Sequence, residues 1–304
     1  MVFRKVLSII FALLFSLLGY GRSANFYFNK GVDSYNNRDY KGAVENYTKT
    51  IQLNPKDVKA YVSRGVAKYY LQDYAGAIED QNKALEINPK YYDAYFNIAD
   101  CKYSLQDYSG AIENYSKTIE LNPKDLVAYM SRGFTKQYVR DFIGAVSDFS
   151  IAIKLKPDLA DGYISRGVAK SYLEDYAGAI IDYATSIQLN PLPDAYFNRG
   201  NAKEALNDLK GALSDFNKVL TINPKHYKAF HNRGQTKASL GDYEGALHDF
   251  NKALELEPHY VEAYYNRAMI EIKIGKKENG YQDLKKAAEL GRVDAKNELQ
   301  NYVL

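Results

Sequence analysis

Residues 58–91 read VKAYVSRGVAKYYLQDYAGAIEDQNKALEINPKY, and this pattern recurs along almost the whole chain. Its clearest marker is the proline near its end. Seven of the eight prolines follow one another at intervals of 34 residues, with one interval of 33; they are Pro55, Pro89, Pro123, Pro157, Pro191, Pro224 and Pro258. A period in this range is typical of an array in which each repeat is one supersecondary unit.

Aligned on these prolines, residues 24–294 divide into eight repeats, with no room for a separate domain. Their bounds are 24–57, 58–91, 92–125, 126–159, 160–192, 193–226, 227–260 and 261–294. Each repeat has an aromatic residue at position 4 and a small residue at positions 8 and 20, such as Tyr61, Gly65 and Ala77. A glycine inside a helix costs roughly 0.5 to 1 kcal/mol relative to alanine, so its recurrence at position 8 indicates close approach of two helices.

Two signals divide each repeat into a pair of helices. Asp73 precedes the apolar period that begins at Tyr74, and its carboxylate can accept hydrogen bonds from the first free N–H groups of a helix. Equivalent aspartates are Asp39, Asp107, Asp141, Asp175, Asp208 and Asp242. Pro89 ends the second helix, because proline disfavours helical geometry in the residue before it. The sequence therefore predicts an all-α chain of helix, tight turn and helix.

This arrangement resembles the tetratricopeptide repeat, which has an aromatic residue at position 4, Gly at 8, Ala at 20, an aromatic residue at 24, Ala at 27 and Pro at 32. The resemblance covers residues 24–294 and implies a right-handed α-solenoid of helix-turn-helix repeats. Departures are local: tyrosine replaces the family's frequent tryptophan at position 4, and Gln81 stands at the aromatic position 24.

The end of the array departs from the pattern in one further way. The eighth repeat has no terminal proline, but Gly291 is suited to a left-handed helix cap. Apolar residues then recur at Val293, Ala295, Leu299 and Tyr302. Residues 293–303 are therefore predicted to form a C-terminal capping helix, because an open array must cover its last apolar face. The helix begins at the end of the eighth repeat, and residues 295–304 contain its end.

The amino terminus has the features of a secretory leader. Arg4 and Lys5 precede a largely apolar run over residues 6–20, which is short for a membrane span of about 20 residues but suits a signal peptide. Small residues near its end permit cleavage before Arg22 or Ala24. We therefore expect residues 1–23 to be a signal peptide and the mature chain to be exported, periplasmic or secreted. An uncleaved membrane anchor and a buried helix that caps the array are the alternatives.

The charge balance argues against two classes of partner. The chain has 40 basic and 37 acidic residues, and removal of the three basic residues of the leader leaves 37 of each. A neutral mature chain lacks the electrostatic footprint of a nucleic-acid binder. Binding to a membrane surface through a basic face is equally unsupported, apart from the possible N-terminal anchor.

No motif indicates catalysis, a metal site or a cofactor. The histidines His226, His231, His248 and His259 form no i, i+4 pair and have no evident second ligand, so they are interpreted as solvated or groove-lining. Cys101, the single cysteine, falls where four other repeats have Ala67, Thr135, Ala169 and Ala202, and is interpreted as a packed small residue. An intermolecular disulfide or a reactive thiol is the alternative for Cys101. The chain is not predicted to be an enzyme.

Positions 7 and 23 vary together across the repeats. Six repeats pair Arg with Asp: Arg64/Asp80, Arg132/Asp148, Arg166/Asp182, Arg199/Asp215, Arg233/Asp249 and Arg267/Asp283. Where position 7 is Lys30 or Ile98, position 23 is Asn46 or Asn114. This dependence predicts a structural bridge between the two helices of a repeat. Shared descent of repeats 1 and 3, or a solvated charged face, would explain it otherwise.

The resemblance also implies where a partner binds. In the family the first helices line a concave face, with positions 2, 5, 6, 9, 12 and 13 directed into it. Position 6 gives a row of short polar side chains: Asn29, Ser63, Asn97, Ser131, Ser165, Asn198, Asn232 and Asn266. This row resembles the asparagine ladder of peptide-modifying glycosyltransferases, and a carboxamide can pair with both N–H and C=O of a peptide. The alternative is that Asn and Ser are merely tolerated at position 6 because this face is solvated.

Tyrosines accompany this row at positions 12 and 13, among them Tyr69, Tyr70, Tyr103, Tyr138 and Tyr172. Groove aromatics are concentrated in repeats 1 to 5, so the two parts of the array are predicted to prefer different ligands. A clamp for a C-terminal carboxylate is disfavoured, because position 2 is more often acidic than basic. The sequence thus predicts a non-catalytic scaffold or assembly factor for extended peptide segments. The alternatives are a recognition subunit of an enzyme complex and a self-associating structural protein of the cell envelope.

Overall fold

The computed structural model describes residues 23–302 and divides after Leu155 into two compact units, the N-terminal half and the C-terminal half. The predicted signal peptide or anchor, residues 1–23, lies outside the described residues apart from Ser23. Among the described helices, none is long and apolar enough to cross a membrane.

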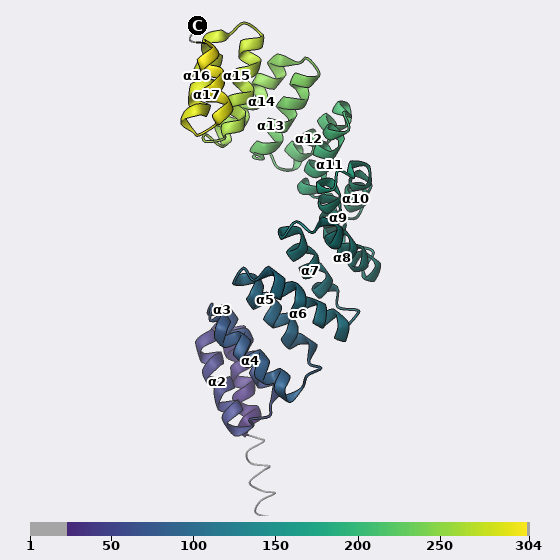
Figure 1. Cartoon of the computed structure of the whole chain (residues 1–304), viewed down its shortest axis with the longest axis vertical. Coiled ribbons are helices and arrows are strands. Elements are labelled where there is room, and N and C mark those ends of the chain that lie inside the picture. Colours follow the sequence, from purple (N-terminus) through teal and green to yellow (C-terminus); the bar gives the residue numbers. More distant parts are fainter. Residues whose placement is uncertain (1–22, 303–304) are drawn as a thin grey trace, which may run out of the picture. The chain divides into compact units, whose positions relative to one another are not determined.

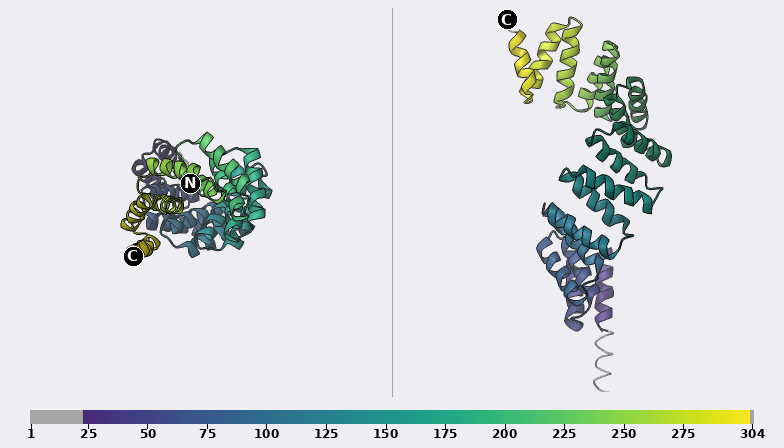
Figure 2. Two further views of the ribbon diagram at one scale, coloured as in Figure 1. Left: turned by 90° about the horizontal axis from the view of Figure 1, so that it is seen from above. Right: turned by 45° about the vertical axis from the view of Figure 1, so that its right-hand side comes forward.

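Both halves consist of helical hairpins that follow one another in chain order (Figure 1), with adjacent helices side by side in the further views (Figure 2). The N-terminal half contains helical residues 23–36, α2 (Tyr40–Leu53), α3 (Val58–Tyr70), α4 (Tyr74–Ile87), α5 (Tyr92–Ser104), α6 (Tyr108–Leu121), α7 (Leu126–Tyr138) and α8 (Phe142–Leu155). The C-terminal half contains α9 (Ala160–Tyr172), α10 (Tyr176–Leu189), α11 (Pro193–Ala205), α12 (Leu209–Ile222), α13 (Tyr227–Ser239), α14 (Tyr243–Leu256), α15 (Val261–Lys273), α16 (Lys277–Glu289) and α17 (Val293–Tyr302). Residues 23–302 include no strand, and the all-α prediction is confirmed.

The turn inside each hairpin is built by two consecutive residues. The first has a positive φ, as at Gln72 (63°) and Gly241 (86°). In seven hairpins the second is a predicted capping aspartate, whose Oδ1 accepts a hydrogen bond from the glycine N–H three residues later at 2.9–3.0 Å. In the last hairpin it is Lys276, whose side chain forms no cap hydrogen bond. The glycine after each aspartate is required by space, since a Cβ at Gly76 would lie 2.3 Å from Asp73 Oδ2. The predicted caps are therefore confirmed.

The small residue at position 8 lets an aromatic ring of the second helix reach the first. A Cβ added at Gly133 would lie 2.7 Å from a ring carbon of Phe149, and one at Gly200 would lie 2.7 Å from Phe216. Both rings are fully buried. The cost of glycine in the helix is thus offset by burial of a large ring, which is the close approach that the sequence predicted.

All six predicted Arg–Asp pairs join the two helices of one repeat. In each pair the arginine Nε donates to Oδ2 at 2.6–2.9 Å and Nη2 donates to Oδ1 at 2.6–2.8 Å. Such two-pronged geometry is the strong form of a charge-assisted hydrogen bond. The predicted bridge between the helices is therefore present in each of these repeats.

Burial of the six aspartates corrects one alternative of the sequence analysis, the solvated charged face. The buried carboxylates are those of Asp80, Asp148, Asp182, Asp215, Asp249 and Asp283. Asp182 is 1% exposed and Asp283, the most accessible of them, is 8% exposed. Because the second helix packs against the first at position 23, the charge is directed between the helices and not into solvent. The solvated face is thus wrong for all six pairs, and the bridges belong to the interior of the array.

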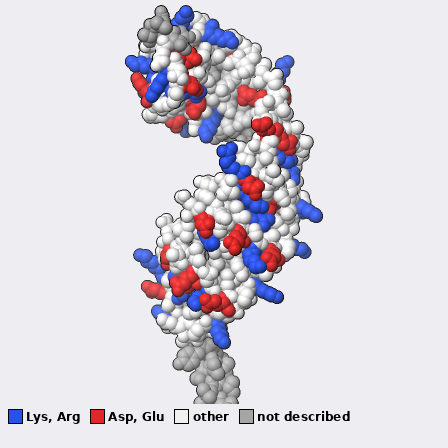
Figure 3. Space-filling view, in the orientation of Figure 1, with Lys and Arg blue, Asp and Glu red and all other residues white. Residues whose placement is uncertain are grey.

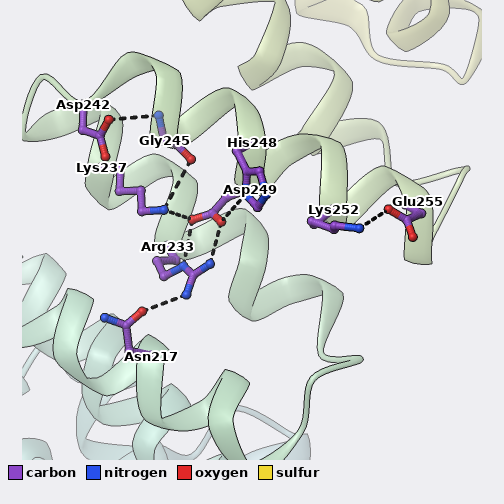
Figure 4. A network of polar contacts seen from close by, with 9 residues as sticks. All are labelled: Asn217, Arg233, Lys237, Asp242, Gly245, His248, Asp249, Lys252 and Glu255. Atoms are coloured by element: carbon purple, nitrogen blue, oxygen red, sulfur yellow. Dashed lines mark hydrogen bonds and ion pairs between the residues drawn. The ribbon is translucent and has the colours of Figure 1, made fainter.

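A lysine that the sequence analysis did not single out completes five of these bridges. Figure 4 shows the example around Asp249, which lies between Arg233 and Lys237, with Lys237 Nζ 2.8 Å from Asp249 Oδ2. Arg233 Nη1 also donates to Asn217 Oδ1 of the preceding repeat at 2.8 Å. Burial alone would raise the pKa of Asp249, but the hydrogen bonds from Arg233 and Lys237 outweigh it and lower that pKa. The bridge thus ties together two helices and two repeats.

The bridge of Asp182 includes this lysine, whereas the bridge of Asp283 lacks it. Lys170 Nζ lies 2.9 Å from Asp182 Oδ2, so Asp182 has two basic partners, Arg166 and Lys170. In the eighth repeat Glu271 stands where the other bridged repeats have the lysine, and the bridge of Asp283 rests on its arginine. The negative charge of Asp283 raises the pKa of Glu271, in addition to the larger effect of burial. The last bridge of the array therefore has one positive charge fewer than the others.

The two repeats without the arginine use their position 23 differently. Asn46 Nδ2 donates to Gly42 O, and Asn114 Nδ2 donates to Gly110 O, each at 2.8 Å within its own helix. An asparagine that satisfies itself in this way needs no partner on the first helix. The dependence between positions 7 and 23 therefore has a structural basis.

The C-terminal capping helix forms as predicted. Gly291 has a φ of 100°, and the backbone N–H of Arg292 returns to Ala287 O at 2.9 Å. Ala295 of α17 is fully buried against Leu284 and Ala287 of α16, whereas Val293 is exposed. The cap thus covers the second helix of the last repeat.

Candidate peptide-binding surface

In each half, a pocket lies where the first helices of neighbouring repeats meet. The N-terminal pocket, about 110 Å³, is formed by α3, α4 and α5, and Tyr69, Tyr70 and Asn97 line it. The C-terminal pocket, about 430 Å³, is formed by α9, α10 and α11, and Tyr172 and Asn198 line it. Of the residues that the sequence placed on a peptide-binding face, three therefore meet in the N-terminal pocket and two meet in the C-terminal pocket.

Tyrosines form two equivalent clusters in the N-terminal half, 68 residues apart in sequence. Tyr40 and Tyr70 stack with ring centroids 4.8 Å apart, and Tyr35 lies 5.7 Å from Tyr70. The corresponding rings Tyr108 and Tyr138 lie 4.5 Å apart, with Tyr103 at 6.3 Å from Tyr138. Tyr138 keeps 63% of its surface exposed. The clusters are thus partly covered aromatic surfaces, of the kind enriched where proteins bind one another.

Tyr40 and Tyr108 were missed by the sequence analysis, which considered only the first helices. Both stand at the first residue of a second helix, directly after the capping aspartate. Tyr74 and Tyr176 occupy the same position in other repeats, and this recurrence is the signal that could have found them. The face that carries the tyrosines therefore includes the hairpin turns.

The row at position 6 is less open than expected. Asn29 is exposed, Ser165 is 7% exposed, and the others are half-buried: Ser63, Asn97, Ser131, Asn198, Asn232 and Asn266. Ser165 Oγ donates to Asp161 O, one turn earlier, at 2.8 Å. A short side chain that bonds back to its own helix does not project from it. Ser165 therefore does not present its side chain to the concave face as the resemblance implies.

Two residues of the row are held by a histidine in the C-terminal half. Asn266 Nδ2 is 2.8 Å from His231 Nε2, and His231 Nδ1 is 2.9 Å from Asn232 Oδ1. A neutral ring with its proton on Nδ1 satisfies both contacts, because one nitrogen then accepts and the other donates. Asn232 Nδ2 donates in turn to Asn201 Oδ1 at 2.8 Å. Neighbouring first helices are thus linked through their polar side chains.

His231 corrects the interpretation of the histidines as solvated or groove-lining. It is 5% exposed, and burial lowers its pKa although the hydrogen bond to Asn232 raises it. Position 5 is apolar or aromatic in every other repeat: Phe28, Val62, Phe96, Met130, Ile164, Phe197 and Tyr265. That pattern marks a packing position and could have identified the burial. His226 also has a structural role, since its Nδ1 accepts from the Ala229 N–H at 3.0 Å at a helix start.

Asp100 adds a half-buried carboxylate to the N-terminal pocket. Its Oδ1 accepts a hydrogen bond from the Tyr115 hydroxyl at 2.5 Å. Burial raises the pKa of Asp100, and this hydrogen bond opposes the increase. The sequence analysis missed Asp100 because other repeats have unrelated residues at position 9. The pocket therefore differs from its counterpart by a negative charge.

The remaining candidates for chemistry are structural. Cys101 is buried, and burial raises its pKa to about 12, as suits the predicted packing role. Within residues 23–302, no group of three or more His, Cys, Asp or Glu side chains could hold a metal ion. On the face seen in Figure 3, basic and acidic side chains are interspersed instead of forming one patch of a single sign.

The sequence model of the family described as Tetratricopeptide repeat matches residues 58–91, 92–125, 193–226, 227–260 and 261–291. The first four of these matches have the bounds of repeats derived above from the prolines, and together the matches cover more than half of the chain. No curated protein matches the sequence.

Several solved structures share the fold. YrrB, described as a TPR protein with an unusual peptide-binding site, is 27% identical with a TM-score of 0.54, over 62% of this chain and 98% of YrrB. MamA is 25% identical with a TM-score of 0.52, over 53% of this chain and 95% of MamA. A tetratricopeptide repeat protein from Parabacteroides merdae is 17% identical with a TM-score of 0.63, over 80% of this chain and 97% of that protein.

Proposed function

Because the chain belongs to the tetratricopeptide repeat family, we propose that it is a non-catalytic protein-interaction scaffold or assembly factor. It binds extended polypeptide segments on the face formed by the first helices. The observation that carries this proposal is that first-helix tyrosines and asparagines line a pocket in each half, with Tyr69 beside Asn97 and Tyr172 beside Asn198. The likeness to YrrB supports the same class of partner.

The side chains on this face match an extended peptide chemically. An asparagine amide offers donors and acceptors to the peptide backbone, while tyrosine rings cover apolar side chains and keep a polar tip. In the C-terminal half, His231 already orders Asn232 and Asn266. Ordering in advance reduces the entropy that binding would otherwise cost.

The test compares variants of the two pockets with matched variants of the second helices. One double variant, Asn198→Ala with Tyr172→Ala, alters the C-terminal pocket. The other, Asn97→Ala with Tyr69→Ala, alters the N-terminal pocket. Lys83→Ala and Lys252→Ala alter exposed side chains of α4 and α14. Each neutral hydrogen bond is worth about 0.5 to 1.5 kcal/mol, so each pocket pair should bind captured partners roughly tenfold or more weakly.

Partners are captured from the native host, and their affinities are then measured with purified proteins. If the pocket variants bind normally while the lysine variants lose binding, the first-helix face is not the binding surface. Asn232 and Asn266 are unsuited to this test, because their removal also leaves His231 without its partners.

The proposal includes export, which rests on the sequence of residues 1–23 alone. The mature protein should begin at Arg22 or Ala24, and amino-terminal sequencing of protein from the native host checks this. A start at Met1 in a membrane fraction would replace secretion with anchoring.

A further inference from the structure

One residue that lines the N-terminal pocket departs from the repeat. Position 24 carries a buried ring in six repeats: Tyr47, Tyr115, Phe149, Tyr183, Phe216 and Phe250. In repeat 2 it carries Gln81, which is fully buried but smaller than a ring. The pocket of about 110 Å³ lies beside Gln81 and opens between α3, α4 and α5. The C-terminal pocket has Tyr183 at this position, so a polar amide in place of a ring distinguishes the N-terminal pocket.

The polar atoms around this space are short of hydrogen-bond donors. Gln81 Nε2 donates to Val62 O at 3.2 Å, but the buried Gln81 Oε1 has no hydrogen-bond partner among the described residues. Asp100 lines the same pocket and accepts a hydrogen bond from Tyr115. A buried acceptor without a partner is unfavourable, and a ligand that supplies donors removes that penalty.

The basic side chains of the surrounding helices do not supply the missing donors. Arg64 and Lys68 of α3 both pair with Asp80, and Lys102 of α5 pairs with Asp107. On α4, Lys83 pairs with Glu86 at the surface. The negative charge of Asp100 therefore remains available to a cation from outside.

We propose that this pocket is a subsite for a lysine side chain of a bound polypeptide. The proposal rests on the proposed function, since it assigns a partner side chain to the same face. The ammonium group carries three donors and no acceptor, which matches Gln81 Oε1, the Asp100 carboxylate and the Asn97 amide oxygen. The methylene stem of the lysine lies along Val66, Tyr69 and Tyr70.

The chemistry of the pocket favours lysine over arginine. Its acceptors belong to three separate side chains, Gln81, Asn97 and Asp100. A compact ammonium on a thin stem suits this space, whereas the planar guanidinium presents five donors in a rigid fork. A tyrosine ring beside the ammonium adds a favourable cation–π contact.

The test uses defined probes and the full chain without its leader. The blocked peptide acetyl-Ala-Ala-Lys-Ala-Ala-amide is titrated into the protein, and NMR signals of the Gln81 side-chain amide and of the Gly65 and Cys101 backbone amides are followed. Norleucine or arginine replaces the lysine in matched peptides, and n-butylamine tests whether a free amine suffices. We expect the lysine peptide to bind about tenfold or more tightly than the norleucine peptide.

Two variants locate the binding. Gln81→Phe restores the ring found at Phe149 and removes the unpaired acceptor Oε1, so it should abolish binding while the protein remains folded by circular dichroism. Asp100→Asn keeps an acceptor for Tyr115 but removes the charge, and should weaken binding about tenfold. Lys252→Ala, on the exposed face of α14, is the control and should leave binding of the lysine peptide unchanged.

Three results would overturn the proposal: unchanged lysine binding in both Gln81→Phe and Asp100→Asn, equal binding of the norleucine peptide, or tighter binding of the arginine peptide. Tight binding of n-butylamine without binding of the lysine peptide would also overturn it, because the occupant would then be a free amine. If these results appear while the pocket pairs above still lose their captured partners, the proposed function stands and only the lysine subsite is wrong.

Discussion

The first-helix faces of the two halves differ in chemistry although their hairpins are built alike. The N-terminal half presents tyrosine clusters around Tyr70 and Tyr138, and none of the four histidines lies in it. The C-terminal half links Asn232 and Asn266 through the buried His231. Caps, glycine contacts and Arg–Asp bridges are common to both. The comparison shows that the residues that hold the hairpin together are separate from those that give each face its character.

The largest expected effect tests whether the bridges serve both halves equally. Asp148→Leu in the N-terminal half and Asp249→Leu in the C-terminal half each leave an arginine and a lysine without their carboxylate. Breaking a buried pair costs about 3 to 5 kcal/mol, so both variants should lose that much local stability. Native-state hydrogen exchange of α7 and α8, and of α13 and α14, measures it.

The matched control is Asn114→Leu in repeat 3, where the asparagine bonds to its own helix and no arginine faces it. Its cost should be clearly smaller. A double-mutant cycle of Arg199→Leu and Asp215→Leu adds a second check, since the double variant should cost less than the sum of the single ones. Strict additivity would mean that the pair is not energetically coupled.

The next largest expected effect is a dependence of stability on pH that differs between the two halves. Burial lowers the pKa of His231, and of His226, below the ordinary value near 6.5 of an unfolded histidine. The unfolded state therefore binds more protons as the pH falls below about 6.5, and stability decreases by up to about 1.4 kcal/mol per pH unit for each group until the folded pKa is passed. Native-state hydrogen exchange measured between pH 7 and 5 should show this loss of stability in α13 and α15 but not in α3 or α5.

His231→Phe is the variant that isolates one of these groups. It keeps a ring at a position that is aromatic in repeats 1, 3, 6 and 8, but it does not titrate. The pH-dependent loss around α13 should shrink in this variant. An unchanged pH profile would show that His231 is not the group that titrates.

A smaller effect concerns the aromatic face alone. Tyr138→Ala removes the contacts with Tyr103 and Tyr108, and an aromatic pair is worth about 0.5 to 1.5 kcal/mol beyond the area it buries. Because Tyr138 is mostly exposed, we expect a loss near 1 kcal/mol in thermal or denaturant unfolding. Ser239→Ala, at the same position of repeat 7, should leave the stability unchanged.

The smallest effect concerns the hairpin turns. Four of them in the N-terminal half place a non-glycine residue at positive φ, such as Gln106, whereas two in the C-terminal half use Gly241 and Gly275. Gln106→Gly should therefore stabilise the protein by about 0.5 to 1 kcal/mol through relief of backbone strain. The entropy that glycine adds to the unfolded chain reduces this gain. Gly241→Gln should destabilise it by a similar amount, because a Cβ there meets no atom and only the backbone is strained. Equal stability of both variants and the parent protein would contradict this account.

The sequence by itself determined the fold and much of its internal bonding. The proline period placed the repeats, and the recurring aspartates and glycines placed the caps and the close helix contacts. Even the pairing of Arg199 with Asp215 could be inferred, because the repeats act as eight aligned copies in which two positions vary together. Each of these features lies within one hairpin, where spacing along the chain largely sets distance in space.

Only the tertiary structure decided which side chains meet across repeats and which are buried. Tyr40 stacks on Tyr70, Arg233 donates to Asn217 of the preceding repeat, and His231 becomes buried between Asn232 and Asn266. The pocket that places Gln81 beside Asn97 and Asp100 likewise forms only where helices of repeats 2 and 3 meet. Such contacts depend on how helices from different repeats pack, and a 34-residue pattern read one repeat at a time does not contain that geometry.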